Sequence, residues 1–301
     1  IRRTGVDKET INICYVTDPS RHLLGLVSIR TLLLSDEDDV IEEIMETNYI
    51  SASTMDDRED VAQWLKKYDF LALPVVDKES RLVGIVTIDD AIDVMEEEAT
   101  EDFELMAGMS PTDKPYLRAG VLETVKSRIP WLMLLMLSAT FTGIVITSFE
   151  DKLAAYSVLI GFIPMLMGTG GNCGNQSSVA VIRGLSLDEI DFGDIFQVAW
   201  KEARVAVVCG GLLSGANFVK LMLVDRWLMG NSEVTVLVAL AICLTLICTV
   251  FCAKVVGAML PLLAEKVGLD PAVLAAPFIS TIVDVLSLLI YFRFAALLLG
   301  L

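Results

Sequence analysis

Five long apolar stretches in the second half of this chain of 301 residues constrain its fold more than any other feature. They occupy residues 129–149, 153–182, 196–224, 234–263 and 273–299. A helix needs about 20 predominantly apolar residues to cross a bilayer. Because backbone inside lipid must satisfy its own hydrogen bonds, the stretches predict that residues 129–301 form an all-α bundle with five membrane-spanning helices.

The charged residues are concentrated ahead of these stretches. Residues 1–128 hold 14 Lys and Arg against 28 Asp and Glu, a net charge of −14, whereas residues 129–301 hold 9 against 12, a net charge of −3. The first part therefore predicts an acidic soluble module. Such a module lacks the basic surface that nucleic acid requires, which excludes nucleic acid as an expected partner. An acidic surface attracts cations, so the expected partners are divalent cations and the lipid bilayer.

Lys and Arg near the ends of the stretches predict the orientation of the bundle. The side that includes the segment before the first stretch carries more of them than the opposite side, which has Lys152 and Arg226. By the positive-inside rule, residues 1–128 then lie in the cytoplasm and the bundle lies in the plasma membrane. An odd number of spans puts the C-terminus outside. Because the chain opens at Ile1 rather than at Met, we also expect residues upstream of it.

An internal repeat organises the acidic part. The sequences YVTDPSRHLLGLVSIRTLL and PVVDKESRLVGIVTIDDAI each predict a strand, a turn, a second strand and the start of a helix. We expect strands at residues 11–16, 23–29, 72–76 and 82–88. Amphipathic helices are expected between the two copies, at residues 36–46 and 57–68.

A tandem strand-turn-strand-helix unit resembles the CBS module, an α/β fold that pairs with a second copy and often binds adenine nucleotides. The resemblance covers residues 1–95, and the first copy is truncated at its start. The second copy closes with Gly84, Thr87 and Asp90, and in such modules the Asp holds a ribose hydroxyl. The first copy has Thr31 in the place of that Asp. The resemblance implies ATP as a ligand of the pair, with the candidate residues Thr87, Asp90, Arg30 and Phe70.

Residues 96–128 form an acidic region that connects the soluble part to the bundle. Pro111 and Pro115 interrupt it, and residues 115–128 predict a helix that leads into the first stretch. The region is not the Gly/Ser-rich sequence of a flexible linker. We therefore expect the soluble part to be mechanically coupled to the bundle.

Asp284 is a carboxylate inside the fifth apolar stretch. Such a group costs at least about 2.5 kcal/mol in a transmembrane helix and normally faces a cavity or a charged partner. Arg293 in the same stretch is nine positions away, about two and a half helical turns, so the two side chains do not face each other. We predict that Asp284 faces an ion pathway; a structural salt bridge is the alternative.

The second stretch is interrupted by GTGGNCGNQ at residues 168–176. Each glycine destabilises a helix by about 1 kcal/mol relative to alanine, and irregular chain in a membrane must line a cavity or pack inside protein. Freed carbonyls and the amides of Asn172, Asn175 and Gln176 are hard oxygen ligands that suit Mg²⁺. We predict a break in the helix that lines an ion pathway. Close helix packing through small residues is the alternative.

Prolines mark the start of the fifth stretch. Asp270 and Pro271 precede it, and Pro277 lies inside it. A proline within a helix removes a backbone donor and frees a carbonyl about one turn earlier, here near Val273. This pattern predicts a second broken helix, with Asp284 beyond the break.

Three sequences together resemble the MgtE family of magnesium channels and transporters: SRIPWL, GTGGNCGNQSSVAVIRGL and GLDPAVLAAPFISTIVD. The resemblance implies a homodimer with five spans per subunit, a Mg²⁺ pore on the two-fold axis, and an acidic helical domain upstream. Ala276 stands where some members of the family carry an Asn. The implied pore site is Asp284, with Asn172, Gly171 and Ser280 as further candidates.

The same resemblance implies gating by cytosolic Mg²⁺, which bridges acids of the CBS pair and the connecting region and holds the pore shut. Clustered carboxylates repel one another, and bound divalent cations neutralise them. A solvated acidic face is the alternative. The matching carboxylates are Asp57, Glu59, Asp69, Asp90, Asp93, Glu98, Glu101, Asp102 and Asp270.

Other function classes remain open to the sequence. A carrier or exchanger for Co²⁺ or Mn²⁺ is one, although softer metals prefer His or Cys ligands to the oxygen-bearing residues singled out here. A nucleotide-sensing membrane regulator without transport is another, and Asp284 within a span argues against it. His22 is the one histidine, and no nucleophile constellation accompanies it, so the sequence predicts no enzyme.

Overall fold

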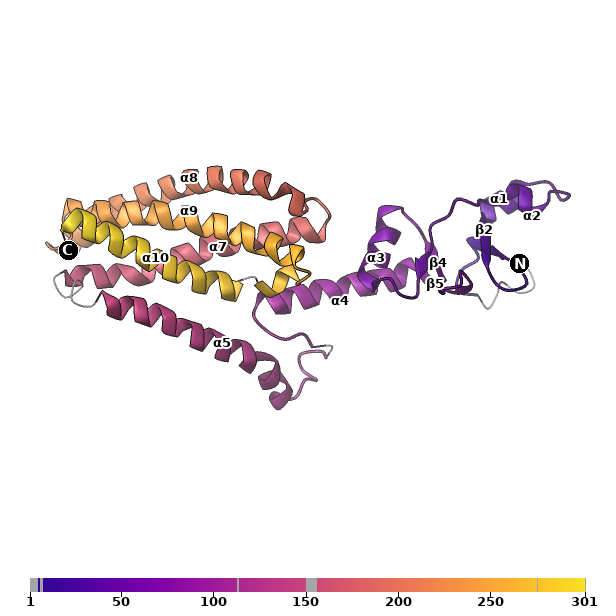
Figure 1. The fold of residues 1–301 in the computed structure, drawn as a ribbon, viewed down its shortest axis with the longest axis horizontal. Coiled ribbons are helices and arrows are strands. Elements are labelled where there is room, and N and C mark those ends of the chain that lie inside the picture. Colours follow the sequence, from indigo (N-terminus) through magenta and orange to yellow (C-terminus); the bar gives the residue numbers. More distant parts are fainter. Residues whose placement is uncertain (1–4, 6–7, 113, 150–155, 275, 301) are drawn as a thin grey trace. The chain divides into compact units, whose positions relative to one another are not determined.

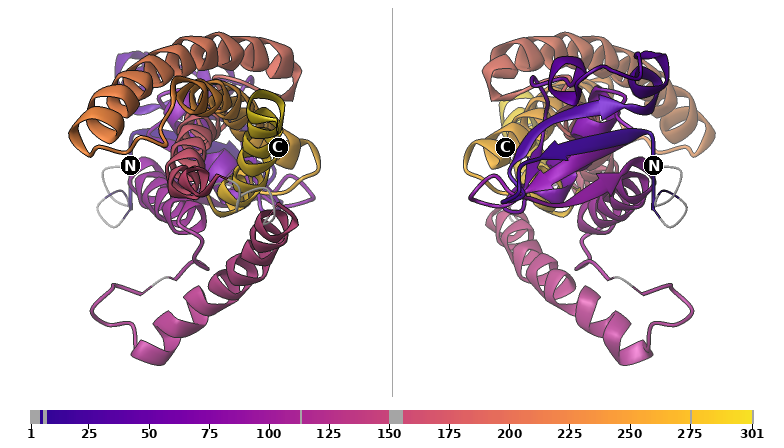
Figure 2. Two further views of the ribbon diagram at one scale, coloured as in Figure 1. Left: turned by 90° about the vertical axis from the view of Figure 1, so that its left-hand side faces the viewer. Right: turned by 90° about the vertical axis from the view of Figure 1, so that its right-hand side faces the viewer.

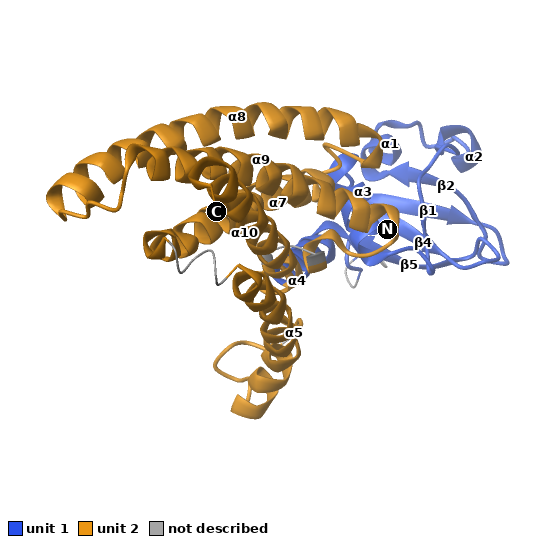
Figure 3. Ribbon diagram, turned by 60° about the vertical axis from the view of Figure 1, so that its left-hand side comes forward, with its two compact units in different colours: residues 1–100 blue, residues 101–301 orange. Residues whose placement is uncertain are grey.

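The computed structural model describes residue 5 and residues 8–112, 114–149, 156–274 and 276–300. The chain divides into two compact units, Ile1–Thr100 and Glu101–Leu301, which Figure 3 colours separately. Each unit is described by itself.

The N-terminal unit is built from two similar hairpins (Figure 1). In each hairpin two antiparallel strands pair with one register shift, at Val16/Thr17 in the first and at Val75/Val76 in the second. This agreement confirms the internal repeat. The elements are β1 (Ile13–Thr17), β2 (Leu23–Ser28), α1 (Ile29–Leu34), α2 (Ile41–Ile44), β3 (Ala52–Ser53), α3 (Arg58–Lys67), β4 (Ala72–Val76), β5 (Leu82–Thr87) and α4 (Ile88–Met106).

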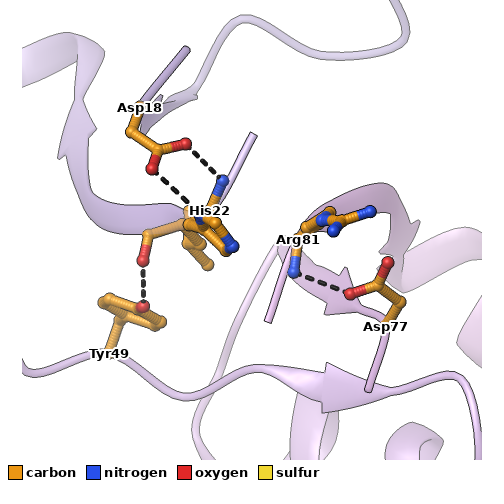
Figure 4. A network of polar contacts seen from close by, with 6 residues as sticks. Asp18, His22, Tyr49, Asp77 and Arg81 are labelled. Carbon is orange, nitrogen blue, oxygen red and sulfur yellow. Dashed lines mark hydrogen bonds and ion pairs between the residues drawn. The ribbon is translucent and has the colours of Figure 1, made fainter. Parts of the chain in front are cut away.

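The turns of the two hairpins meet, as Figure 4 shows. His22 and Arg81 form an isolated antiparallel bridge between the two copies. Each turn is closed by its own aspartate: Asp18 accepts from the backbone of His22 at 2.8 Å, and Asp77 accepts from the backbone of Arg81 at 2.8 Å. The His22 ring also hydrogen-bonds Asp18, at 2.7 Å, and this contact lowers the pKa of the Asp18 carboxyl. The pairing of turns joins the copies into one unit.

Two helices of this unit differ from the sequence expectation. The helix expected at residues 36–46 shrinks to the four residues of α2. Its first part forms a local turn instead, in which the Asp39 carboxylate accepts from the backbone N–H of Asp36 at 2.9 Å, and such side-chain bonds compete with helix formation. In contrast, α4 continues through the acidic residues to Met106, because glutamate is a good helix former.

The C-terminal unit is helical in its described residues (Figure 1). Residues 153–155 of the predicted second span lie outside the described residues; the rest of that span forms η2 and α7. The helix leading into the first span begins at Val121 rather than at Pro115. The elements are α5 (Val121–Ser148), η2 (Ser157–Phe162), α7 (Ile163–Ser186), η3 (Phe192–Asp194), α8 (Ile195–Lys220), η4 (Leu221–Leu228), α9 (Val236–Lys266), η5 (Pro271–Leu274) and α10 (Ala276–Leu299).

Among the described residues, four helical segments are long and apolar enough to cross a membrane: Val121–Ser148, Phe192–Leu228, Val236–Lys266 and Pro277–Leu299. The remaining long helix, α7, carries the glycine and amide sequence and is less apolar. It packs against both α9 and α10, so much of its surface contacts protein. Around it lies the main core, which includes Leu166, Ile242 and Val283.

Helix α5 stands apart from the rest of the bundle in the end-on views of Figure 2. It contacts α10 through a hydrogen bond between Ser138 and Thr281 of 3.1 Å and an edge-on contact between Trp131 and Phe278. None of its most apolar segment is buried within the chain. Its apolar side chains are therefore left for lipid or for another helix.

Candidate ion pathway

Helix α7 runs unbroken through the glycine-rich sequence, from Ile163 to Ser186. The predicted break at residues 168–176 is therefore wrong. The glycines serve close packing, which was the alternative. A Cβ on Gly170 would lie 2.7 Å from Thr249 of α9 and 2.8 Å from Val283 of α10, both too close for a side chain. The helix tolerates its glycines because the neighbouring helices fill the space that side chains would occupy.

The exposed face of α7 is amide-rich. Asn172 and Gln176 lie four residues apart and are both exposed, whereas Gly170, Gly171 and Gly174 on the other side are buried. Side chains four residues apart share a helix face. Two amides on the outer surface of a membrane bundle are costly in lipid, so this face is suited to water or to another polar surface.

Helix α10 begins at Ala276, so Pro277 lies in its first turn, at the start of the apolar segment Pro277–Leu299. The stretch 273–299 is interrupted just ahead of Pro277, because η5 (Pro271–Leu274) and α10 are separate elements. Proline is tolerated in the first turn of α10, where its missing N–H has no partner to lose. The 3₁₀ turn η5 precedes the helix. The carbonyl of Pro277 accepts from the hydroxyls of Ser280 and Thr281, at 3.2 and 3.1 Å. The side chain of Ala276 lies outside the described residues.

Asp284 lies two turns into α10 and is half-buried. Within the described part of the chain its carboxylate has no recorded hydrogen bond or ion pair, and Arg293 does not reach it. The structural salt bridge that the sequence left as an alternative is thus not formed. An unpaired carboxylate in an apolar helix is expected to face water or a cation.

Two of the candidate pore residues, Gly171 and Ser280, come together where α7 meets α10. A Cβ on Gly171 would lie 3.7 Å from the Cβ of Ser280, an ordinary van der Waals distance. Asn172 follows Gly171 on α7, and Asp284 follows Ser280 by one turn of α10. The hydroxyl and the carboxylate therefore lie on one helix beside this contact, whereas the amide of Asn172 lies on the exposed face of α7. These are oxygen ligands of the kind that Mg²⁺ and its water shell prefer.

A second polar cluster in the bundle escaped the sequence argument. Lys254, within the apolar α9, is only 5 % exposed. Its ammonium donates to the hydroxyl of Ser177 at 3.3 Å, and that hydroxyl donates to the carboxylate of Glu202 at 2.6 Å. The sequence places Lys254 inside the apolar stretch 234–263 and gives it no role. The sequence feature that could have revealed the cluster is a lysine in the middle of an apolar segment long enough to form one helix.

The acids predicted to bind regulatory Mg²⁺ are dispersed. Among the described residues, no three side chains of His, Cys, Asp or Glu lie close enough together to hold a metal ion. Several act as local caps: Asp57 caps α3 by accepting from the N–H of Glu59 at 2.9 Å, and Asp270 accepts from the N–H of Ala272 at 2.7 Å. Asp69, Asp90 and Asp93 are exposed, and Glu101 and Asp102 are half-buried on α4.

Arg58 forms an ion pair with Glu98, one of the predicted metal ligands. Its guanidinium contacts Glu97 at 3.0 Å and Glu98 at 2.9 Å, and thus joins the start of α3 to α4. The two carboxylates raise the pKa of the Arg58 guanidinium. A cation that binds Glu98 must therefore compete with an arginine already in place.

The candidate nucleotide residues lie in both copies of the repeat. Thr87 donates to the Asp90 carboxylate at 2.9 Å, at the junction of β5 and α4. Phe70 is half-buried beside Tyr68, and Arg30 is exposed on α1 in the first copy. The first copy repeats the geometry with a different partner, because the Ser28 hydroxyl contacts that of Thr31 at 2.9 Å.

Within the C-terminal unit, the end of α4 touches the start of α10. Gly108 has a φ of +69° and closes α4: its N–H donates to Leu105, and that of Met109 donates to Glu104, at 2.9 Å each. This is the Schellman arrangement that glycine favours. A Cβ on Gly108 would lie 2.9 Å from the Pro277 ring. The end of α4 thus lies against the start of the helix that carries Asp284.

Comparisons with known proteins agree with this architecture. The family model for MgtE, a divalent cation transporter, matches residues 163–294, and that for the CBS domain matches residues 41–97. The magnesium transporter MgtE of Thermus thermophilus is 40% identical over 299 residues, covering 99% of this chain and 64% of that protein. MgtE of Bacillus subtilis is 38% identical over 287 residues, covering 95% and 61% respectively.

Among solved structures, the cytosolic domain of the Mg²⁺ channel MgtE in complex with ATP is 46% identical, covers 31% of this chain and 38% of that one, and has a TM-score of 0.30. The chain spans about three fifths of the length of the curated relatives that it matches. Its CBS-type repeat, its apolar helices and the residues that line α7 and α10 all fall within these matches. The chain is a multi-pass membrane protein that belongs to the MgtE family.

Proposed function

We propose that this chain forms a Mg²⁺ pathway across the plasma membrane, along the seam between α7 and α10. The observation that carries the proposal is Asp284: a half-buried carboxylate in a membrane-spanning helix, without a cationic partner among the described residues. Ser280 supplies a neutral oxygen one turn earlier on α10, and Asn172 supplies another from the exposed face of α7. A site of this composition attracts a hydrated divalent cation by charge and holds its water shell by hydrogen bonds.

The exposed face of α7 supports a homodimer as part of this proposal. Asn172 and Gln176 point away from the bundle of their own subunit. A second copy that faces this surface across a two-fold axis would enclose the amides and bring two Asp284 carboxylates to one path. Like charges so placed repel until a divalent cation binds between them. In this arrangement the protein conducts passively, with residues 1–128 in the cytoplasm and the C-terminus outside.

Gating by cytosolic Mg²⁺ is the second part of the proposal. The acids of the CBS pair and of residues 96–128 bind Mg²⁺ when its concentration is high and hold α4 in the closed position. Because no three of the described acids form a ligand cluster by themselves, each regulatory ion needs water, a second copy or residues upstream to complete its coordination. The contact of Gly108 with Pro277 supports a transmission route from α4 to α10.

ATP binding at the CBS pair is proposed from one contact, the hydrogen bond between Thr87 and Asp90. The Thr87 and Asp90 pair lies at the start of α4, with both side chains held in place by their mutual hydrogen bond. A carboxylate in that position can accept from the ribose hydroxyls of a nucleotide. ATP bound here would stabilise the CBS pair by mass action.

Ion flux into liposomes tests the transport proposal. We expect the purified full chain to admit Mg²⁺, and to admit Co²⁺ and Mn²⁺ less well at equal concentration, since softer metals gain less from oxygen ligands. Empty liposomes give the leak rate. Preferred Co²⁺ or Mn²⁺ entry would support a carrier for those ions instead, and no flux of any divalent cation would favour a regulator without transport.

A further inference from the structure

The buried polar cluster of Lys254, Ser177 and Glu202, here called the membrane triad, has no part in the proposed ion pathway. It joins three helices: Ser177 belongs to α7, Glu202 to α8 and Lys254 to α9. The Lys254 and Glu202 side chains are 6% and 13% exposed, with 3.9 Å between their charged atoms. The Ser177 hydroxyl lies between them, accepting from one and donating to the other. The hydroxyl thus uses its one donor and one of its two acceptor sites within the triad.

Helix α7 needs such a directional contact. The middle of its buried face is lined by Gly170 and Gly174, whose backbone lies against α9 and α10, and the larger buried side chains such as Leu166 and Val181 lie toward its ends. Small residues allow a close approach, but they present few side chains that would oppose rotation or sliding of the helix. A buried charge left without its partner is strongly unfavourable, so a charged contact penalises each wrong setting of the helix. Polar contacts of this kind are known to fix register between helices.

We propose that the membrane triad sets the rotation and depth of α7. Ser177 faces the bundle, and its neighbour Gln176 is exposed on the amide face together with Asn172. Holding Ser177 in place therefore directs both amides toward the ion pathway. Ser177 acts as a positioning residue, because it contacts no pore residue itself. The functional part of this inference rests on the proposed Mg²⁺ pathway; the structural part does not.

Flux measurements on Ser177→Ala test the functional part. The substitution removes the hydroxyl but neither charge, and alanine fits a helix well. We expect the Mg²⁺ concentration for half-maximal flux to rise about tenfold, the loss commonly seen when a group that orients metal ligands is removed. A contact that only stabilises the fold would lower the amount of active protein, and so the maximal flux, without a change in the half-maximal concentration.

Ser178→Ala is the matched control. Ser178 is the next residue of α7 and is equally buried, and its hydroxyl has no hydrogen-bond partner among the described residues. This variant should keep the half-maximal concentration of the unmodified chain. If Ser177→Ala does not fold, Lys254→Met combined with Glu202→Gln removes both buried charges at once and takes its place in the comparison. Unchanged half-maximal concentrations in the triad variants would overturn the functional part.

A disulfide reports the rotation of α7 without any assay of transport. Gly171→Cys combined with Ser280→Cys places two Cβ atoms 3.7 Å apart in the present setting, within the range of about 3.5–4.5 Å found for disulfides. Oxidation should cross-link this pair readily in the otherwise unmodified chain and in the Ser178→Ala background. In the Ser177→Ala background we expect several-fold slower cross-linking.

Variants with a single introduced cysteine show whether native Cys173 contributes to the cross-link. Equal cross-linking in the Ser177→Ala and Ser178→Ala backgrounds would overturn the positioning role, whatever the flux. Absence of flux in the unmodified chain would overturn the proposed function alone, and the cross-linking comparison would still decide whether the triad positions α7.

Discussion

The carbonyl group of Gly174 in α7 occupies the space that a Cβ of Gly257 in α9 would need, so the two helices touch backbone to backbone. In the same stretch a Cβ on Gly174 would come within 2.7 Å of Ile279 of α10. The glycines that suggested an interrupted helix are thus what allows α7, α9 and α10 to pack closely against one another. Function depends on this packing because it brings α7 against the helix that carries Asp284.

Bulky residues at these contacts should disrupt the bundle. We expect Gly174→Leu and Gly257→Leu to lower the thermal stability of the detergent-solubilised chain sharply, because even modest overpacking costs about 1–3 kcal/mol and here backbone would have to move. Gly211→Leu is the control: it lies on α8 with no atom within 4 Å of the position of its Cβ. Size-exclusion profiles and melting temperatures measure the effect. Equal stability of all three variants would show that the close approach is not required.

Asp284→Ala should abolish divalent flux without loss of folding. The carboxylate is half-buried and has no recorded partner in the described residues, so its removal relieves the cost of a charge in the membrane and leaves no charge unpaired. We expect Mg²⁺ flux to fall at least about tenfold, which corresponds to about 1.4 kcal/mol, with an unchanged or raised melting temperature. Ser287→Ala, one turn away, is the control: it tests whether removal of another polar side chain from α10 also lowers the Mg²⁺ flux. Wild-type flux in Asp284→Ala would remove Asp284 from the pathway.

Neutralising the acids of α4 should weaken inhibition by internal Mg²⁺ while conduction persists. Glu98, Glu101 and Asp102 lie three and four residues apart, so they share one side of α4. In a variant with Gln, Gln and Asn at these positions, we expect the half-inhibitory Mg²⁺ concentration in excised patches to rise roughly fivefold or more. A fivefold change is at the lower end of the range that coupling between two sites usually produces. An unmoved inhibition curve in this triple variant would exclude them from gating. A flat curve in the unmodified chain would mean that gating needs residues upstream.

Arg58→Ala should have the opposite effect on gating. The arginine holds Glu97 and Glu98, and its loss leaves both carboxylates free for a cation. Because the pair is substantially exposed, we expect little loss of stability. Inhibition should shift to lower internal Mg²⁺. Lys66→Ala is the control: Lys66 also lies on α3 and forms no ion pair among the described residues. This variant removes one positive charge as well, so it shows how much of the shift comes from net charge alone. Identical curves for both variants would argue that Glu98 binds no regulatory ion.

Gly108→Ala should alter gating without touching an ion ligand. Its positive φ and its contact with the Pro277 ring both exclude a side chain. Alanine would strain the end of α4, because its left-handed backbone costs about 1 kcal/mol for a residue with a side chain. Its Cβ would also clash with the Pro277 ring and displace the start of α10. We expect a changed open probability at fixed Mg²⁺ with an unchanged single-channel conductance. Gly120→Ala, where the Cβ meets nothing within 4 Å, is the control. Changed conductance instead would indicate damage to the pathway itself.

The sequence by itself determined the division of the chain and the identity of its repeat. Charge and hydropathy separated the acidic part from the apolar stretches because lipid and water select opposite side chains. The repeated turn chemistry at Asp18 and Asp77 specified both hairpins, since an aspartate that caps its own turn acts locally. Asp284 stood out for the same reason, because a carboxylate within an apolar stretch is visible in the sequence.

The tertiary structure decided what the glycines and buried charges do. Glycine weakens a helix in isolation, and only the presence of α9 and α10 around α7 shows that close packing outweighs this cost. Lys254 and Glu202 are 52 positions apart in the sequence and Ser177 is on a third helix, so no local pattern predicts that they meet. Packing between distant segments sets these relationships, and a linear pattern carries no information about which helix faces which.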